Sequence, residues 1–503
     1  MTLLQAIEFV IVRVRLTALL LLGVTQSGFG QFSAPEYAQR RAALLNEIPE
    51  GVVVALGAHE PPQDYLAFYQ APSFNYLTGF LEPDAALVMV KSARGVASML
   101  FVEPRLPARE VWVGARLGVD AARQRTGIAT RDNSDLVRVL DSLATTGLTM
   151  YVAGDFPDVD GGDHAVLTPD QQLLAGLRKR YPNLVVKNAT PYVEALRGSK
   201  SAGELALIRQ AAAITARAER EAMQALAPGM NEFEIQALVE YVFRRNGADR
   251  PSFSSIIGSG PNATTLHYNL DDRFIERGDL VVMDIGASYK GYAADVTRSI
   301  PASGVFTPMQ REVYQIVRDA EAAAERQAKI GAPAPLMSDS AAAVLAAGLT
   351  KLGLIESPSA TYDCDFGGQS MQCAQLQLYY MHGLGHGIGL EVHDPDQFYY
   401  TQLIAPGSAF TIEPGIYVRS NVLDVLPPTP RNHALAAKLR PAVERYRNIG
   451  VRIEDDYVAT ASGVEWVSRA PREIAEIEAI MKTPRTTHAT RDSALVERYR
   501  QPH

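Results

Sequence analysis

The segment 280–298 constrains the fold and the chemistry of this chain more than any other stretch. Two apolar runs rich in β-branched residues flank the sequence Ser-Tyr-Lys-Gly, a pattern typical of a β-hairpin. An even-length turn centred between Tyr289 and Lys290 would place Asp284 directly opposite Asp295. Carboxylates that face each other across two strands repel, and burying such a pair is costly unless a proton or a cation compensates the charge.

The hairpin by itself does not choose its register. A shifted register, with one of the two aspartates in solvent, is as compatible with the pattern as the facing pair. The facing pair implies a cation only if other metal-ligating side chains converge on the same place, so the rest of the chain has to decide between the two registers.

Composition narrows the class of protein and its partners. The chain has 503 residues, of which 47% are apolar and 21% charged, which predicts an ordinary globular protein, most simply of two domains. The formal net charge is -8, and no basic block occurs anywhere. Nucleic acids and anionic membranes are therefore poor candidates as partners.

The N-terminus has the pattern of a secretory signal peptide. Arg13 and Arg15 precede an apolar run, 16–24, and a stretch of small residues then ends at Gly30. The run is too short for a membrane span, which needs about 20 apolar residues. We expect residues 1–30 to be removed and the protein to be exported, periplasmic or secreted. An uncleaved anchor, or a cytoplasmic protein whose start codon lies further downstream, is the alternative.

Two domains follow the signal peptide. Residues 31–197 alternate helical and strand patterns, which predicts an α/β domain with a mixed sheet and a scaffolding role. Residues 198–203 have the composition of a linker. From there to residue 482, a pair of helices followed by strands occurs twice, which suggests a duplicated α/β unit.

Two segments of the second half fall outside this pattern. Residues 363–377 look like an inserted loop that contains the two cysteines of the chain, Cys364 and Cys373. Two cysteines allow neither a disulfide framework nor a Cys-based metal site; they would pair in an oxidising compartment and stay free in a cytoplasm. The tail 483–503 is polar and irregular, and we expect it to be disordered.

Three of the nine histidines of the chain, His382, His386 and His393, fall within the segment 381–393. Two histidines four residues apart could lie on a helix, as in zinc proteases. Glycine occupies every second position from 383 to 389, however, and would cost about 1 kcal/mol at each helical position. An extended or looping backbone fits better, with glycines that admit the close approach of a ligand.

Two glutamates lie in strand patterns further along the chain. Glu413 stands near the end of an apolar strand, and alternation in 451–456 puts Arg452 and Glu454 on one face. Together with the aspartates of the hairpin and one histidine, these glutamates form an oxygen-rich set of donors. Such a set suits Mn²⁺, Co²⁺, Fe²⁺ or Zn²⁺ in a two-metal site better than a structural zinc.

The chain resembles the Xaa-Pro aminopeptidases (aminopeptidase P). The resemblance lies in the residues named above, in the segment 75–80 (Asn-Tyr-Leu-Thr-Gly-Phe) and in Glu110-Val111-Trp112. These enzymes belong to the superfamily of methionine aminopeptidase, prolidase and creatinase. The resemblance covers residues 37–481. It implies a creatinase-like N-terminal domain followed by a catalytic domain with the pita-bread fold.

The resemblance also implies a role for each site residue. The ligands of two divalent ions would be Asp284, Asp295, His386, Glu413 and Glu454, of which Asp295 and Glu454 would bridge the ions. His267 matches the histidine that contacts the substrate near its proline. His382 and His393 match the other two histidines of the active site, and Arg452 matches an arginine beside Glu454.

The activity implied by the resemblance is removal of the first residue from a peptide whose second residue is proline. A hydroxide that bridges two ions, expected to be Mn²⁺ with Co²⁺, Zn²⁺ or Fe²⁺ as alternatives, would attack the carbonyl before the proline. Glu413 would carry the proton to the leaving nitrogen, while His382 and His393 would stabilise the developing charge. Enzymes of this kind form dimers or tetramers, so we expect a homo-oligomer.

Three other functions are compatible with a chain of this type. A prolidase would cleave only Xaa-Pro dipeptides. A creatinase-like amidinohydrolase needs no metal and is disfavoured because all five ligand types are present. The fold also serves as a metal-free interaction module, typically after loss of the ligands.

Overall fold

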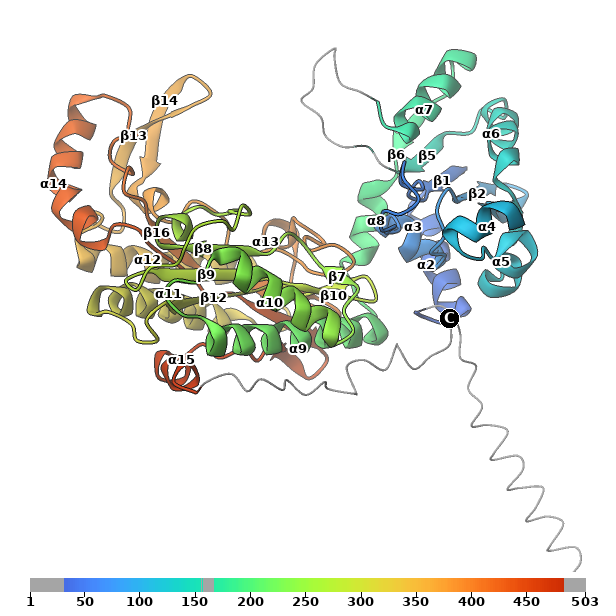
Figure 1. The fold of residues 1–503 in the computed structure, drawn as a ribbon. Helices are drawn as coiled ribbons and strands as arrows, with labels where there is room; N and C mark the ends of the chain where they lie inside the picture. The colour runs from blue at the N-terminus through green and yellow to red at the C-terminus, as the bar shows by residue number, and fades with distance from the viewer. Residues whose placement is uncertain (1–30, 155, 157–166, 484–503) are drawn as a thin grey trace, which may run out of the picture. The chain divides into compact units, whose positions relative to one another are not determined.

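The computed structural model describes residues 31–154, 156 and 167–483, which form two compact units that divide between Thr190 and Pro191 (Figure 1). The predicted signal peptide, 1–30, lies outside the described residues, as does all but the first residue of the predicted tail. The predicted domain boundary after residue 197 coincides with the end of helix α8 (Thr190–Arg197).

A mixed six-stranded sheet forms the N-terminal unit, as the sequence predicts. In spatial order its strands are β4 (Ala129–Asp132), β3 (Gly95–Val102), β2 (Ala86–Ser92), β1 (Gly51–Leu56), β5 (Met150–Ala153) and β6 (Val186–Asn188). Strand β1 pairs antiparallel with β2 and parallel with β5. Both β1 and β5 are buried along their whole length, which is typical of strands that are covered on both faces.

Among the described residues of this unit, six α-helices precede α8. They are α2 (Ala34–Glu47), α3 (Pro72–Thr78), α4 (Pro107–Val113), α5 (Gly118–Thr126), α6 (Leu136–Ala144) and α7 (Pro169–Arg180). The start of α7 shows how local sequence defines an element. Thr168 and Gln171 form a reciprocal capping box, and Pro169 occupies the first turn, where its missing N–H costs nothing.

The second unit contains two pairs of long helices, as the duplicated pattern predicts. The first pair is α9 (Ala202–Ala225) and α10 (Glu232–Arg245), and the second is α11 (Pro308–Gln327) and α12 (Pro335–Leu352). Three further α-helices follow α12 in the described part of the chain: α13 (Phe398–Thr401), α14 (Pro430–Tyr446) and α15 (Ile474–Met481). Within the described part of the chain, no helix has both the length and the apolar composition needed to cross a membrane.

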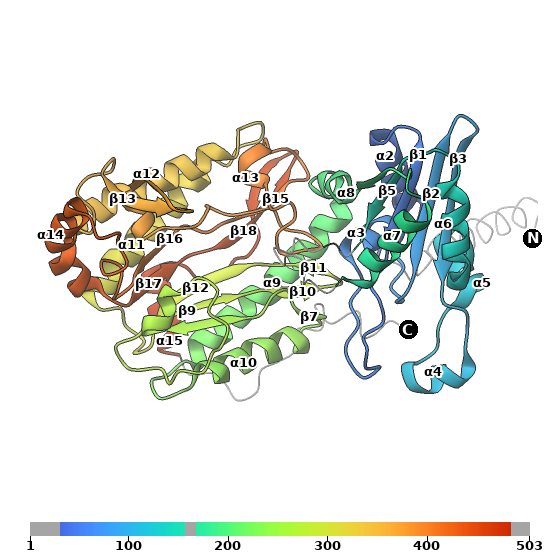
Figure 2. The ribbon, with the colours of Figure 1, turned by 90° about the horizontal axis from the view of Figure 1, so that it is seen from above.

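Most strands of the second unit lie between these helix pairs, whereas the strands within 361–374 lie beside α14 (Figure 2). One sheet has the order β12 (Val296–Pro301), β9 (Leu280–Ile285), β8 (Ile256–Ser259); another has the order β15 (Ala409–Ile412), β18 (Asp455–Thr460), β19 (Gly463–Trp466). A two-stranded sheet joins β16 (Gly415–Val418) to β17 (Ile449–Arg452). A bridge between Thr297 and Glu454 connects the first sheet to the chain just ahead of β18.

The central hairpin differs from its predicted register. Asp284 lies opposite Thr297 rather than Asp295, because the turn is centred between Lys290 and Gly291, one residue later than predicted. A two-residue hairpin loop needs a positive φ at both positions; φ is 51° at Lys290, and the glycine adopts 82° without strain. Moving the centre by one residue shifts each pairing by two, which preserves the face.

The predicted inserted loop, 363–377, is also different. Most of it forms a second hairpin, β13 (Thr361–Phe366) and β14 (Gln369–Ala374), which turns at Gly367 and Gly368. A disulfide joins Cys364 to Cys373, one on each strand. The adjacent glycines, both with positive φ, are the signal of a tight turn that the sequence analysis did not use.

Candidate metal centre and active site

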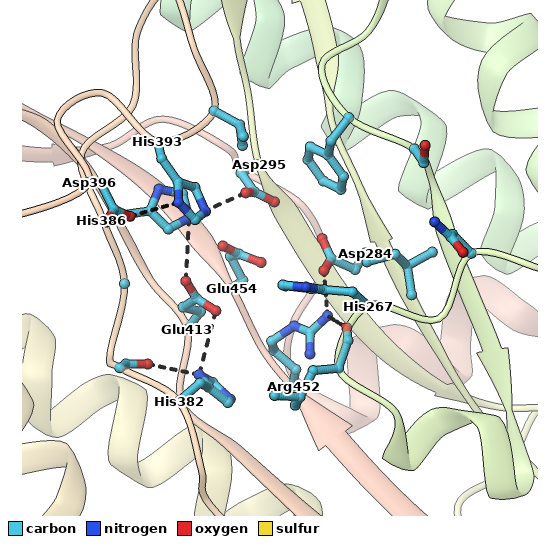
Figure 3. A pocket seen from close by; sticks show the side chains of 18 of the residues that line it. His267, Asp284, Asp295, His382, His386, His393, Asp396, Glu413, Arg452 and Glu454 are labelled. Atoms are coloured by element: carbon cyan, nitrogen blue, oxygen red, sulfur yellow. Dashed lines mark hydrogen bonds and ion pairs between the residues drawn. The ribbon is translucent and has the colours of Figure 1, made fainter. Parts of the chain in front are cut away.

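One cavity of the second unit, of about 460 Å³, contains every predicted site residue (Figure 3). The residues that the structure brings together on its walls are His267, Asp284, Asp295, His382, His386, His393, Glu413, Arg452 and Glu454. They come from segments that are far apart in sequence and meet only because the sheets pack together.

The four carboxylates occupy the ends of strands. Asp284 is the second-last residue of β9 and Asp295 directly precedes β12, and both side chains point into the cavity (Figure 3). Glu413 directly follows β15, and Glu454 directly precedes β18. Glu413 is partly exposed and the other three are buried.

Hydrogen bonding fixes which nitrogen of His386 faces the carboxylates. Nδ1 lies 3.0 Å from the carbonyl oxygen of Gly387, which can only accept, so Nδ1 carries the proton. Nε2 of the neutral ring therefore presents a lone pair, and it lies 3.5 Å from both Asp295 Oδ2 and Glu413 Oε1. Ligand atoms of Asp295, His386 and Glu454 all lie within 4.8 Å of one another. Lone pairs that converge in this way are the arrangement of a cation site.

Charge in the cavity is strongly unbalanced. Burial, followed by repulsion from Asp284 and Glu413, raises the pKa of Asp295 well above its ordinary value, and burial and Asp295 do the same to the pKa of Glu454. One buried oxygen each of Asp284 and Asp295 has no hydrogen-bond partner. The donors are carboxylates and one imidazole, so this site fits divalent metal ions.

Arg452 supplies the guanidinium of this cavity wall, and four of its five N–H groups donate to protein groups. It forms an ion pair with Asp284, donates to the carbonyl oxygen of Leu266 at 3.3 Å and donates to Thr297 Oγ1 at 3.2 Å. A further N–H donates to the Tyr417 hydroxyl at 2.8 Å. The guanidinium thus orients Asp284 from the side and neutralises part of the negative charge.

His382 belongs to the same hydrogen-bonded chain. Its Nδ1 donates to the carbonyl oxygen of Gly383 at 2.8 Å, so Nε2 accepts from Tyr417, 2.9 Å away. Burial, with a smaller contribution from Arg452, lowers the pKa of His382 to about 3. His382 is therefore neutral at physiological pH, and both of its nitrogens have protein partners.

The other two histidines are exposed at the mouth of the cavity. The His393 ring lies 3.9 Å from the His386 ring, centroid to centroid, and its Nδ1 is 2.7 Å from Asp396 Oδ1. Burial and His386 lower the pKa of His393. His267 points into the cavity beside Arg452 (Figure 3).

The glycines around His386 have a different purpose from the predicted one. A Cβ at Gly385 would lie 2.5 Å from the Thr411 carbonyl oxygen, and one at Gly387 would lie 2.6 Å from the Pro395 nitrogen. At these two positions neighbouring backbone fills the space that was predicted for a ligand. At Gly383, which lines the cavity, the nearest atom to a Cβ would be 3.8 Å away, so that position stays open. The segment is a loop, as the glycine spacing predicts.

Several residues that hold the carboxylates escaped the sequence analysis. Thr297 donates to Glu454 Oε2 at 2.6 Å, Thr411 Oγ1 lies 3.5 Å from Glu413 Oε1, and Asp456 accepts from the Asp295 backbone N–H at 3.2 Å. Tyr417 links Arg452 to His382. All four are in or beside strands at alternate positions from a site residue, a signal that period-2 spacing could have provided.

Comparison with known proteins agrees with this geometry. The model of metallopeptidase family M24 matches residues 206–461, about half of the chain, and the model of the aminopeptidase P N-terminal domain matches residues 37–151. The chain belongs to metallopeptidase family M24. Its N-terminal and catalytic parts therefore have the architecture that the resemblance implied.

Several M24 relatives match over most of their length. The Xaa-Pro aminopeptidase of Escherichia coli (strain K12) is 32% identical over 470 residues, which cover 90% of this chain and 99% of the relative. The human Xaa-Pro dipeptidase is 30% identical over 477 residues, which cover 88% and 92%.

Solved structures of M24 enzymes share the fold. Escherichia coli aminopeptidase P with the inhibitor Pro-Leu has a TM-score of 0.72 at 31% identity, and so does Pseudomonas aeruginosa aminopeptidase PepP. Each match covers 90% of this chain and 98% of the other.

Metal ions should stabilise the protein increasingly as the pH rises. Without metal, the raised pKa values of Asp295 and Glu454 mean that the folded protein keeps protons which the unfolded chain releases above its ordinary carboxyl values of 3.8 and 4.5. The free energy of unfolding of the metal-free protein therefore falls as the pH rises through this range and beyond. Bound cations replace those protons, and at 100 times Kd they add about 2.7 kcal/mol.

Thermal unfolding with Mn²⁺ or with a chelator, between about pH 5 and pH 8, measures this effect; K⁺ at equal ionic strength is the control. We expect the Tm difference between the Mn²⁺ and chelator samples to widen with pH. A difference that stays constant or narrows would contradict the assignment of the cavity as a metal centre.

Proposed function

We propose that this chain is an Xaa-Pro aminopeptidase, a hydrolase that releases the first residue of a peptide whose second residue is proline. The observation that carries the proposal is the convergence of four carboxylates and four histidines on one cavity in a chain of family M24. The high coverage of relatives that are named Xaa-Pro aminopeptidase supports the substrate class.

Five residues would hold the metal ions of this enzyme: Asp284, Asp295, His386, Glu413 and Glu454. We propose Mn²⁺ as the ion, with Co²⁺, Zn²⁺ or Fe²⁺ as alternatives, because the set is rich in carboxylates and contains one imidazole. When bound, such ions lower the pKa of water and polarise the scissile carbonyl.

The protein groups then have distinct tasks. Burial raises the pKa of Glu413, so this carboxylate is suited to take up a proton and deliver it to the leaving proline nitrogen. Asp396 accepts from Nδ1 of His393, so Nε2 would donate to the reacting carbonyl oxygen when the ring carries a second proton, a state that the Asp396 carboxylate favours. His267 would contact the substrate near its proline. Both nitrogens of His382 have protein partners. We therefore assign it the task of orienting Tyr417, in place of the predicted task of stabilising the developing charge.

The cavity favours an aminopeptidase over a prolidase. A dipeptide places its terminal carboxylate on the proline, where a free cation would be needed to hold it. Among the described residues on the cavity wall, Arg452 is the one Arg or Lys side chain. It already forms an ion pair with Asp284, and four of its five N–H groups donate to protein groups. A longer peptide has no charge at this position and needs no such cation.

Peptide cleavage with added Mn²⁺, Co²⁺ or Zn²⁺ tests the proposal. We expect cleavage of an Xaa-Pro-Yaa tripeptide, much slower cleavage of the Xaa-Pro dipeptide and none of Xaa-Ala-Yaa. Preference for the dipeptide would indicate a prolidase instead. A protein that binds no metal and cleaves none of the peptides would indicate an interaction module.

Replacing Asp295 should abolish activity together with metal pairing. The Asp295→Asn variant removes one negative charge from the cavity and one bridging carboxylate, so we expect kcat to fall by at least about 100-fold and metal stoichiometry to fall below two. Asp424→Asn is the matched control, because Asp424 is exposed and pairs with Arg440 on the surface. Turnover close to wild type in the Asp295 variant would refute the assignment.

We also propose that the protein is exported. The disulfide between Cys364 and Cys373 supports this location, because disulfides persist in oxidising compartments. When the full chain is produced in a bacterial host, the mature protein should begin at Gln31 and appear outside the cytoplasm. N-terminal sequencing of the fractionated protein checks this, and an intact N-terminus in the cytoplasm would contradict it.

A homo-oligomer, a dimer or a tetramer, remains part of the proposal. Support comes from helix α4, where the side chains of Val111 and Trp112 are 82% and 77% exposed. Large apolar side chains with this exposure are typical of surfaces that contact another protein.

A further inference from the structure

Two basic side chains at the predicted interdomain linker, 198–203, are buried against the loop that follows His386. Lys200 lies in the linker, and Arg197 directly precedes it. Arg197, the last residue of α8, is only 2% exposed, and Lys200, just before α9, is 5% exposed. Basic side chains are seldom buried unless a partner requires them. In both cases the partner is Asp394, which is itself 2% exposed and follows His393 directly in the chain.

Arg197 and Lys200 bind Asp394 from two directions. The Arg197 guanidinium contacts Asp394 Oδ2 through Nε at 3.2 Å and through a terminal nitrogen at 2.9 Å, and it also donates to Glu391 Oε2 at 2.5 Å. The Lys200 ammonium donates to the backbone carbonyl oxygen of Asp394. One cation thus neutralises the carboxylate, while the other fixes the backbone beside it.

Asp394 in turn closes the loop 387–395. Its Oδ2 accepts from the Leu390 N–H at 2.9 Å, and its own N–H donates to the carbonyl oxygen of Gly387 at 2.7 Å. The loop packs tightly on its support: a Cβ at Gly389 would lie 2.4 Å from Asp394 Oδ2 and 2.9 Å from Lys200 Cε. A displacement of either basic side chain would therefore move the loop.

Three site residues depend on this loop. His386 directly precedes the loop and His393 lies within it, and the centroids of their rings are 3.9 Å apart. The Gly389 carbonyl oxygen accepts from the Ala293 N–H at 2.8 Å, two residues ahead of Asp295. The loop consequently sets the position of His386, which would be a metal ligand, of His393 at the cavity mouth and of the backbone that leads to Asp295.

We propose that Arg197 and Lys200 are positioning residues of the active site, which hold His386 and His393 in place through Asp394. Neither touches the cavity, so their effect is indirect. The part of the inference that concerns turnover rests on the proposed function, whereas the part that concerns metal binding does not.

Arg197→Met and Lys200→Met, made in the full chain, test the proposal. We expect each to weaken Mn²⁺ binding, measured by calorimetry, by about 10- to 100-fold, because groups that orient a ligand contribute this much. We expect kcat to fall by up to about 100-fold while KM changes little, since a histidine displaced by 1 Å affects the reaction more than ground-state binding.

Arg245→Met is the matched control. Arg245 is also buried and forms an ion pair with Glu221, between helices α10 and α9, and neither residue touches the loop. Losing this ion pair should lower the Tm about as much as the Arg197 and Lys200 substitutions do, but without changing the Mn²⁺ affinity or kcat. If the Arg197 and Lys200 variants behave like this control, losing stability alone, the proposal is wrong.

Arg197→Lys covers the case in which Arg197→Met does not fold. It keeps the charge beside Asp394 but loses the fork of donors, so we expect a folded protein with an intermediate loss of Mn²⁺ affinity. Wild-type affinity and kcat in both Arg197→Lys and Lys200→Met would overturn the proposal. If the wild-type protein cleaves no Xaa-Pro peptide, the proposed function fails, and the Mn²⁺ affinities alone still decide this inference.

Discussion

Repulsion between four carboxylates in one cavity is the constraint on which the rest of the catalytic unit depends. Asp284, Asp295, Glu413 and Glu454 could not stay together without compensation, because burial strengthens every charge interaction among them. The protein supplies one cation, Arg452, and hydrogen-bond partners such as the Thr297 hydroxyl. Divalent ions would supply the remaining positive charge, so the metal is part of the energetics of folding as well as of the chemistry.

Buried ion pairs outside the cavity keep this charged set rigid. Behind Glu454, Arg298 donates to the Glu454 carbonyl oxygen at 2.7 Å and pairs with Asp455 at 2.7 Å, with both side chains fully buried. Next to His393, Arg197 forms a similar buried ion pair with Asp394. Both pairs bind the chain directly beside a site residue. Burying these charges costs free energy of desolvation. Their placement suggests that the ion pairs serve to position the site residues precisely rather than to raise the stability of the fold.

Local sequence signals account for much of the fold. The repeated order of helix pairs and strands predicted the elements of the catalytic unit. The structure contains them, and capping boxes at Asn231 and Thr307 start two of the helices. The alternation of helix and strand predicted the mixed sheet of the N-terminal unit. Predictions failed where a turn had to be placed to the residue, as at Lys290 and Gly291, because the pattern of apolar residues alone does not mark the turn centre.

The sequence by itself determined which residue types take part in the chemistry, because carboxylates and histidines in those local patterns have few other uses in an apolar interior. All nine predicted site residues line the cavity. Only the tertiary structure decided how they are held: that Asp284 lies opposite Thr297, that both nitrogens of His382 are occupied, and that Lys200 of the predicted linker and the preceding Arg197 bind Asp394. These contacts join positions that are far apart in sequence. Their geometry depends on how sheets, loops and connectors pack, which no local pattern encodes.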